Sequence, residues 1–262
     1  MSEGKVVVAR ENNLGRIIFD NPKKHNAMSK AMWDQLAEAM QSFDAEDEIR
    51  VVVLEGAGDK SFVSGADISK FESERANVDR IKKYGVSVNR AYSAVQHALK
   101  PTIAKIDGYC YGGGMGIAVC TDLRICSENS NFCIPAAKLG VGYGHENTKV
   151  LMDLVGPAFT KEIFYTGRRF SADEAKGMGL VNSVHRTADL DDYVASYVDT
   201  MATNAPLSLK TTNLIVNELL KTEGDCDIAL CQRLVEDCAA SQDIEEGRLA
   251  FMEKRKPQFI GR

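Results

Sequence analysis

Three consecutive glycines at positions 112–114 are the residues of this sequence best suited to holding a negatively charged oxygen. They follow an apolar run at 101–111 and precede the small and apolar residues 115–118, a pattern that predicts a strand turning sharply into a helix. Backbone N–H groups at the start of a helix have no partner within the helix and lie at the positive end of its dipole. Because glycine has no side chain, a developing oxyanion can approach these N–H groups closely.

A second turn of small residues lies earlier in the chain, at 62–68, with the sequence Phe-Val-Ser-Gly-Ala-Asp-Ile. It also joins an apolar run to a polar, helix-like stretch. Two such turns could each direct one backbone N–H at the same oxygen, an arrangement that stabilises an enolate. The alternative is that both are tight packing turns without a ligand. We predict an enolate-stabilising site built from the main chain of both turns.

The elements that must position these turns alternate between strand-like and helix-like segments as far as residue 190, which predicts a largely parallel sheet with crossover helices. An uninterrupted apolar run at 51–54 indicates a strand buried on both faces. Beyond residue 190 only helix-like segments remain. The expected strands are 6–9 and 16–19 (a hairpin), 51–54, 102–106 and 123–126. The expected helices are one capped by Ser29, one near 75–100 with Ile81, Tyr84, Val88, Tyr92, Val95 and Leu99 on one face, and four at 190–204, 206–221, 226–240 and 242–255. Residues 171–174, Ser-Ala-Asp-Glu, form a capping-box pattern.

Composition excludes several classes of protein. The net charge is -5, whereas a nucleic-acid-binding protein normally carries a basic stripe. The seven cysteines form no Cys-x-x-Cys pair, so we expect free thiols in a reducing compartment and no zinc site. The N-terminus lacks a signal-peptide pattern, and no apolar run approaches the ~18 residues of a membrane span. We therefore expect a cytoplasmic protein with no metal, nucleic-acid or membrane partner.

The two turns, in this order, resemble those of the enoyl-CoA hydratase/isomerase (crotonase) superfamily. Five further segments match that family, at 21–28, 120–124, 166–172, 179–182 and 251–257. The resemblance implies an α/β fold, with a crotonase-like spiral of ββα turns over residues 1–190 that binds acyl-CoA. It also implies an α-helical oligomerisation region over 191–262, and a homotrimer or a dimer of trimers.

Members of this family bind acyl-CoA thioesters and hold the thioester oxygen between two backbone N–H groups. The resemblance assigns these donors to Ala66 and Gly113. No cofactor is expected beyond the coenzyme A that the substrate carries. Phe251 and Lys254 match positions that reach coenzyme A bound to a neighbouring subunit. All the positions that the resemblance assigns to coenzyme A are Lys23, Lys24, Ala27, Gly65, Asp67, Ile68, Phe251 and Lys254.

This chain lacks the two glutamates with which the family's hydratases add water. The matching positions are Gly116 and Ala136, and neither residue can transfer a proton. Hydration by the usual pair of carboxylates is therefore not expected, and the site must use another polar group.

The loop 140–147 contains the remaining polar candidates. Its Gly-Val-x-Tyr pattern looks like that of the methylmalonyl-CoA decarboxylase branch, in which the matching tyrosine, here Tyr143, orients the substrate carboxylate. That branch places a histidine where Ala66 stands. We favour decarboxylation of a malonyl-type thioester or a related enolate reaction. One alternative is hydration or isomerisation through Glu146 and His145. These two residues could equally form a solvent-facing helix start. The other alternative is a non-catalytic CoA-binding subunit.

Overall fold

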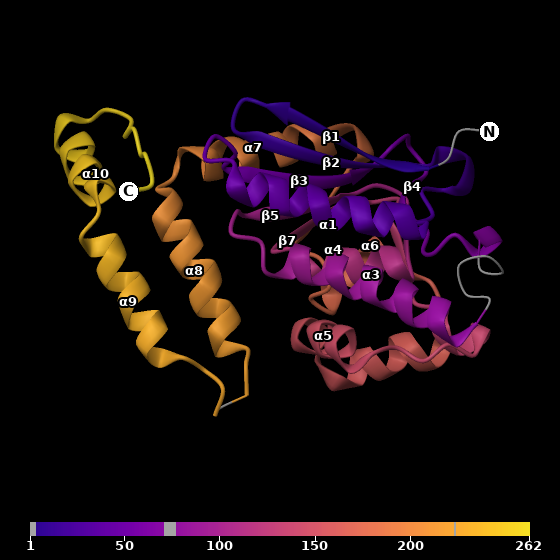
Figure 1. Cartoon of the computed structure of the whole chain (residues 1–262). Helices are drawn as coiled ribbons and strands as arrows, with labels where there is room; N and C mark the ends of the chain where they lie inside the picture. The colour runs from indigo at the N-terminus through magenta and orange to yellow at the C-terminus, as the bar shows by residue number, and fades with distance from the viewer. Residues whose placement is uncertain (1–3, 71–76, 223) are drawn as a thin grey trace.

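The computed structural model describes residues 4–70, 77–222 and 224–262 and shows a mixed α/β protein with two sheets (Figure 1). The hairpin of β1 and β2 is antiparallel, and β2, β3, β5, β7 and β10 follow in parallel register. The six strands of the larger sheet are, in spatial order, β1 (Lys5–Glu11), β2 (Leu14–Asp20), β3 (Val51–Gly56), β5 (Thr102–Ile106), β7 (Leu123–Ser127) and β10 (Ser183–His185). The smaller sheet contains β4 (Ser61–Val63), β6 (Tyr109–Tyr111), β8 (Asn131–Cys133) and β9 (Phe170–Ser171).

From β3 to β8, consecutive strands alternate between the larger and the smaller sheet, and a helix follows each pair of strands. The pairs β3 and β4, β5 and β6, and β7 and β8 each place one strand in either sheet, so the expected spiral of ββα turns is confirmed. The helices are α1 (Lys30–Ala45), α3 (Val78–Gln96), α4 (Gly113–Cys120), α5 (His145–Thr166), α6 (Ala172–Gly177), α7 (Leu190–Thr203), α8 (Pro206–Leu219), α9 (Ile228–Ala239) and α10 (Gln242–Glu253), with 3-10 turns at η1 (Pro22–Lys24), η2 (Ile68–Lys70), η3 (Ala136–Leu139) and η4 (Thr187–Asp189).

The strand β3 is buried on both faces, as its apolar run predicts. Because side chains alternate along a strand, Val52 and Leu54 pack into the core on one face, and Val51 and Val53 pack with α7 on the other. The face that carries Val52 is covered by α1, α3 and α4, which lie together below the sheet in Figure 1. The sheet is therefore a rigid platform between two layers of helix.

The two long helices before the glycine triplet begin and pack largely as expected. The Ser29 hydroxyl accepts a hydrogen bond from Met32 N and caps α1. On α3, Tyr84, Tyr92 and Val95 are buried, but the predicted stripe is wrong at its ends. Ile81 is 52% exposed, and Leu99, which lies beyond the end of α3, is 37% exposed. The core is narrower than α3 is long, so an apolar residue at either end extends past it.

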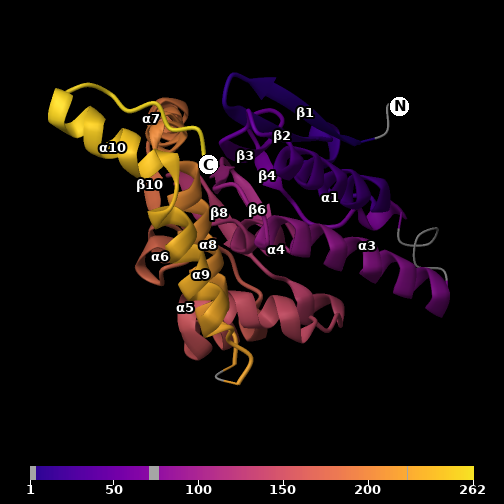
Figure 2. The same cartoon turned by 60° about the vertical axis from the view of Figure 1, so that its left-hand side comes forward.

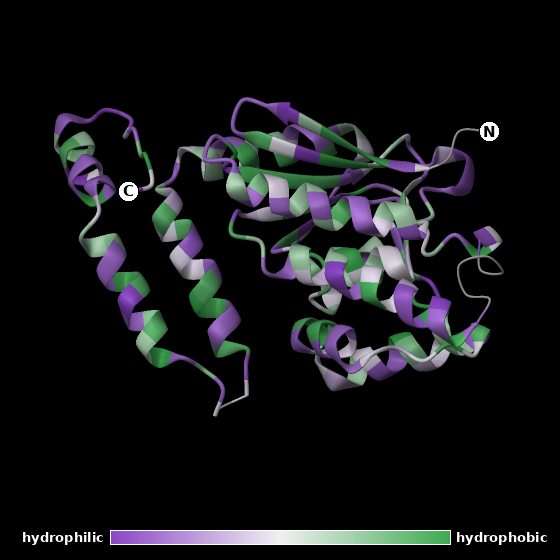
Figure 3. Ribbon diagram, in the orientation of Figure 1, coloured by the Kyte–Doolittle hydropathy of each residue, from purple (hydrophilic) through white to green (hydrophobic). Residues whose placement is uncertain are grey.

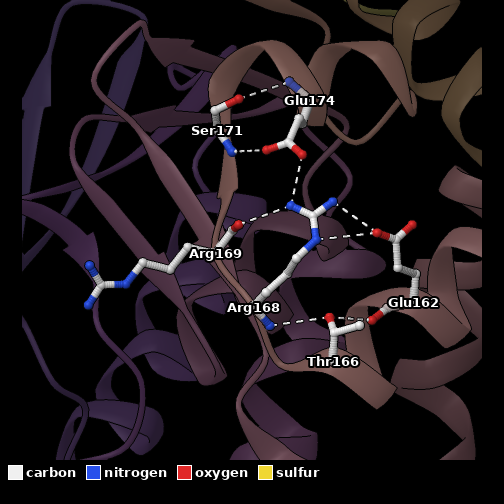
Figure 4. Close-up of polar contacts among 6 residues, drawn as sticks. All are labelled: Glu162, Thr166, Arg168, Arg169, Ser171 and Glu174. Carbon is white, nitrogen blue, oxygen red and sulfur yellow. Dashed lines mark hydrogen bonds and ion pairs between the residues drawn. The ribbon is translucent and has the colours of Figure 1, made fainter.

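Arg168 ties the end of α5 to the start of α6 (Figure 4). Its guanidinium pairs with Glu162 at 2.9 Å and with Glu174 at 2.8 Å. Glu174 also closes the predicted capping box with Ser171, since each accepts a hydrogen bond from the other's backbone N–H. This junction fixes the C-terminal end of α5 to the start of α6.

The four expected C-terminal helices are present, but they do not pack alike. Leu190, Val194 and Val198 of α7 pack on the larger sheet, whereas α8, α9 and α10 extend away from it (Figures 1 and 2). None of the residues of α9, all of which are described, is buried. Hydrophobic residues nevertheless run along α8 and α9 (Figure 3). A domain boundary at residue 190 stays a prediction.

The cysteines are free thiols among the described residues, as expected, and the four in the core are Cys110, Cys120, Cys126 and Cys133. Burial raises the pKa of Cys120 to about 12, so this thiol stays protonated and unreactive at neutral pH. Within the described part of the chain, no helix combines the length and apolar character needed to cross a bilayer.

The glycine at 114 is required by close packing, which predicts a strong effect of adding one methyl group. A Cβ at Gly114 would lie 2.1 Å from the Val63 carbonyl oxygen, whereas a Cβ at Gly85, inside α3, would meet nothing within 4 Å. We expect Gly114→Ala to lower the free energy of unfolding by about 1–3 kcal/mol. The matched Gly85→Ala should raise it by about 0.5–1 kcal/mol, because alanine favours the helix. Urea denaturation measures both, and equal effects would contradict the packing argument.

Candidate functional site

The first turn contains Gly65, whose φ of +114° lies in a region that glycine adopts readily. Met28 N donates to the Gly65 carbonyl at 2.8 Å, and Asp67 N donates to the Met28 carbonyl at 2.8 Å. These two bonds clamp the main chain on either side of Ala66. The Ala66 N–H itself donates to no other residue that the structure describes, and Ala66 is only half-buried.

The second turn is formed by Gly112, with φ +50° and ψ -113°, directly before α4. Gly112 N donates to the Cys133 carbonyl at 2.7 Å, and Gly116 N donates back to the Gly112 carbonyl at 3.0 Å. The Gly113 N–H, at the first position of α4, has no acceptor among the described residues. It is therefore a free donor at the positive end of a helix.

The structure brings these two turns into contact. A Cβ built on Gly65 would lie 3.8 Å from Gly113 N, and a Cβ built on Gly112 would lie 3.7 Å from Gly65 Cα. The unpaired N–H groups of Ala66 and Gly113 thus come from adjacent segments of main chain. Such a pair can stabilise a negative oxygen placed between them.

The Tyr143 hydroxyl lies beside this pair of turns. Its oxygen is 3.9 Å from the position of a Cβ on Gly112, and its ring packs edge-on against Phe164, with centroids 5.1 Å apart. The loop before α5 therefore places one phenol, half-buried and firmly packed, at the edge of the main-chain site. This is the position that a substrate-orienting group requires.

Tyr92 fills the space beside Gly116, the position of the first missing glutamate. A Cβ at Gly116 would lie 2.3 Å from the Tyr92 hydroxyl oxygen, so no side chain fits there unless Tyr92 moves. The Tyr92 hydroxyl donates to the Gly113 carbonyl at 3.2 Å, and its ring packs edge-on against Trp33. Burial, with a smaller contribution from nearby Tyr143, raises the pKa of Tyr92 well above its ordinary value. The phenol therefore stays neutral and keeps its proton for this bond.

Tyr92 was missed as a site residue by the sequence analysis, which placed it only on the apolar face of its helix. The signal that could have found it is the glycine at 116, since a missing side chain in a packed core must be compensated by a large neighbour. The identity of that neighbour depends on how α3 crosses α4, which the local pattern does not give.

The remaining positions considered for proton transfer lie outside the two turns. Ala136, at the position of the second missing glutamate, is buried at the start of η3. His145 and Glu146 form the first turn of α5, with their side chains 91% and 61% exposed and 3.5 Å apart. They face a groove along α3 and α4 that Tyr92 also lines. Among the described residues, no hydrogen bond or ion pair joins these two side chains to either turn.

Of the predicted coenzyme A positions, Lys24 and Asp67 are paired with each other. Lys24 Nζ is 2.7 Å from the Asp67 carboxylate, which also accepts hydrogen bonds from Ser69 N and Oγ and so caps η2. Burial acts to raise the pKa of Asp67, but the hydrogen bonds from Lys24 and Ser69 outweigh it and the net shift is downward. Asp67 thus fixes the 21–28 segment to the first turn.

The other predicted coenzyme A positions divide between the site and the C-terminal arm. Lys23 is exposed, and its ammonium has no partner among the described residues. Ala27 is buried beneath the first turn, and Ile68 is 61% exposed just after it. Phe251, 82% exposed, and Lys254 lie at the end of α10, far from the two turns of the same chain (Figure 1). In the described part of the chain, no three His, Cys, Asp or Glu side chains gather in a way that could hold a metal ion.

Curated relatives match this chain over its full length. A short-chain-enoyl-CoA hydratase of Clostridium acetobutylicum is 31% identical over 256 residues, which are 98% of this chain and 97% of the relative. A crotonyl-CoA hydratase of Syntrophomonas wolfei is also 31% identical, over 100% of both chains.

Solved structures agree with the sequence relatives. An enoyl-CoA hydratase/carnithine racemase from Magnetospirillum magneticum has a TM-score of 0.91 at 33% identity and covers 100% of this chain and 97% of its own. An enoyl-CoA hydratase from Bacillus anthracis has a TM-score of 0.92 at 27% identity, over 98% of this chain and 100% of its own. The family model described as enoyl-CoA hydratase/isomerase matches residues 9–262. The protein therefore belongs to the enoyl-CoA hydratase/isomerase family, and has its crotonase fold.

Proposed function

We propose that this chain is an enzyme that forms a thioester enolate from an acyl-CoA, with the oxyanion held between the N–H groups of Ala66 and Gly113. The observation that carries this proposal is the contact between two turns whose N–H groups lack acceptors among the described residues. In a dry site, one such donor contributes about 3–4 kcal/mol to the transition state. The chemistry uses no cofactor beyond the coenzyme A of the substrate.

The reaction we favour is loss of CO2 from a malonyl-type thioester. The bond between Cα and the carboxylate breaks, its electron pair forms the enolate double bond, and the thioester oxygen takes the negative charge. No base has to remove a proton from carbon, which suits a site with neither family glutamate. Tyr143 would hold the carboxylate out of the thioester plane, so that the breaking bond overlaps the carbonyl π system. The product forms when Cα takes a proton in a later step.

Hydration or isomerisation is the second candidate, and the relatives favour it. The relatives from Clostridium acetobutylicum and Syntrophomonas wolfei are both named hydratases. In this chain the proton would have to be handled by Glu146, with His145 beside it, because Gly116 and Ala136 carry no acid. Glu146 is 61% exposed, so substrate binding would have to cover it.

Coenzyme A binding would use positive charge near the first turn and the arm of another subunit. Lys23 is exposed and its ammonium has no partner among the described residues, whereas Lys24 is already paired with Asp67. Phe251 and Lys254 are too far along the C-terminal arm to reach the site of their own chain. We therefore propose a homotrimer or a dimer of trimers, in which these two residues contact coenzyme A on a neighbour. A cytoplasmic location and the absence of nucleic-acid and membrane partners stay predictions.

The first test compares methylmalonyl-CoA with crotonyl-CoA as substrates. We expect decarboxylation of methylmalonyl-CoA, and a kcat about 100-fold lower in Tyr143→Phe, because one group that holds the reacting bond is lost. Tyr165→Phe is the matched control, since Tyr165 is 73% exposed on α5 and should leave the rate unchanged.

Each alternative has its own outcome in the same assay. Hydration of crotonyl-CoA that is lost in Glu146→Gln and kept in Tyr143→Phe would replace decarboxylation with the second candidate. Binding of both thioesters without turnover would indicate a CoA-binding subunit and contradict an enzymatic role.

The second test concerns assembly. Leu219 of α8 is 64% exposed in the single chain, so a charge there should leave the fold intact but disrupt a contact with another copy. We expect light scattering to give three or six times the chain mass of 28.7 kDa, and a lower mass for Leu219→Glu. Val86→Glu, at a 68% exposed site on α3, is the control and should keep the assembly. A wild-type mass of 28.7 kDa would rule out the proposed oligomer.

A further inference from the structure

A groove of about 1230 Å³ runs beside the proposed site, between the core helices and α8. Its walls come from α3, α4, α5 and α8, and its apolar side chains include Val119, Leu154, Leu214 and Leu220. Val119 and Cys120 lie three and four residues after Gly116 on α4, so all three occupy the same face of that helix. The groove therefore lies on the face of α4 that also carries Gly116.

Tyr92 stands where the groove meets the glycine turn. Its side chain lines the groove, and its hydroxyl contacts the first turn of α4 by donating to the Gly113 carbonyl. The hydroxyl oxygen is 3.6 Å from a Cβ position on Gly113 and 2.3 Å from one on Gly116. One residue thus touches both the oxyanion-binding turn and the groove, with 5% of its surface exposed.

Several contacts keep Tyr92 in this place. Its ring packs edge-on against Trp33, with centroids 5.3 Å apart, and Trp33 Nε1 in turn donates to the Tyr84 hydroxyl at 3.0 Å. These aromatic side chains lie beneath the glycine turn and leave Tyr92 little room to rotate away. The barrier is therefore a packed side chain and not a mobile loop.

We propose that Tyr92 sets the length of the acyl group that the site accepts. Its phenol closes the groove at the end nearest the thioester site, so a short acyl group fits between the two turns and Tyr92, and a longer one meets the ring. With a small residue at 92, the acyl chain would run along α4 into the groove. This inference rests on the proposed function, because it extends the same thioester site.

The test measures binding of saturated acyl-CoAs, which need no turnover. Calorimetry with butyryl-CoA and decanoyl-CoA gives the ratio of their dissociation constants for each variant. We expect the wild type to bind decanoyl-CoA no more tightly than butyryl-CoA. Tyr92→Ala should bind decanoyl-CoA at least tenfold more tightly than the wild type does, since each buried CH2 can lower the dissociation constant by up to about fourfold.

Two controls separate chain length from general damage. Tyr92→Phe keeps the ring and should keep the wild-type ratio. Val95→Ala removes a buried side chain from α3 at a position outside the groove wall, and should also keep that ratio. Thermal unfolding checks each variant, and Tyr92→Leu, which also removes the ring, replaces Tyr92→Ala if the latter does not fold.

The possible results distinguish the role of Tyr92 from the proposed function. An unchanged ratio in both Tyr92→Ala and Tyr92→Leu, or a wild type that already prefers decanoyl-CoA tenfold, would overturn the role of Tyr92 and leave the enolate site standing. A folded wild type that binds neither acyl-CoA would overturn the proposed function, and the inference with it.

Discussion

The close approach of two main-chain turns is the constraint on which the rest of this structure depends. Gly65 and Gly112 have positive φ angles, and a Cβ on Gly114 would overlap the Val63 carbonyl. Glycine is therefore favoured at 65 and 112 by the backbone conformation, and at 114 by the close approach of the two segments. Met28 hydrogen-bonds to both sides of the first turn, and Gly112 N in the second turn donates to the Cys133 carbonyl. The N-terminal segment and the smaller sheet therefore both hold the turns.

That constraint explains the distribution of buried groups around the site. Asp67 pairs with Lys24 directly after the first turn, and this pair fastens the turn to the chain that clamps it. Tyr92 packs against the second turn and donates to its Gly113 carbonyl, so the start of α4 is held by a side chain of α3. The N–H groups of Met28, Asp67 and Gly112 have fixed acceptors, whereas those of Ala66 and Gly113 have none among the residues that the structure describes.

Much of this fold follows from local pattern, and the exceptions have a common cause. The turns, the Ser29 and Ser171 caps and the doubly buried strand 51–54 are properties of short segments, so the sequence predicts them. The exposure of Ile81 and the contact of Tyr92 with Gly116 depend on where one helix crosses another. The positions of such crossings are set by the packing of the whole core, which short-range periodicity does not contain.

The reactions available to this site depend on the acidic side chains that are missing from it. At position 116 a carboxylate has no room, and at 136 the chain has a buried alanine, so the groups that would exchange protons with carbon are absent from both family positions. The described side chains beside the two turns include those of Tyr143 and Tyr92, and burial raises the pKa of Tyr92, so its phenol serves as a hydrogen-bond donor. Phenols and main-chain N–H groups can orient a substrate and stabilise negative charge, whereas removing a proton from carbon requires a base. Loss of CO2 releases an electron pair without a base, and for this reason we propose decarboxylation ahead of hydration for this chain.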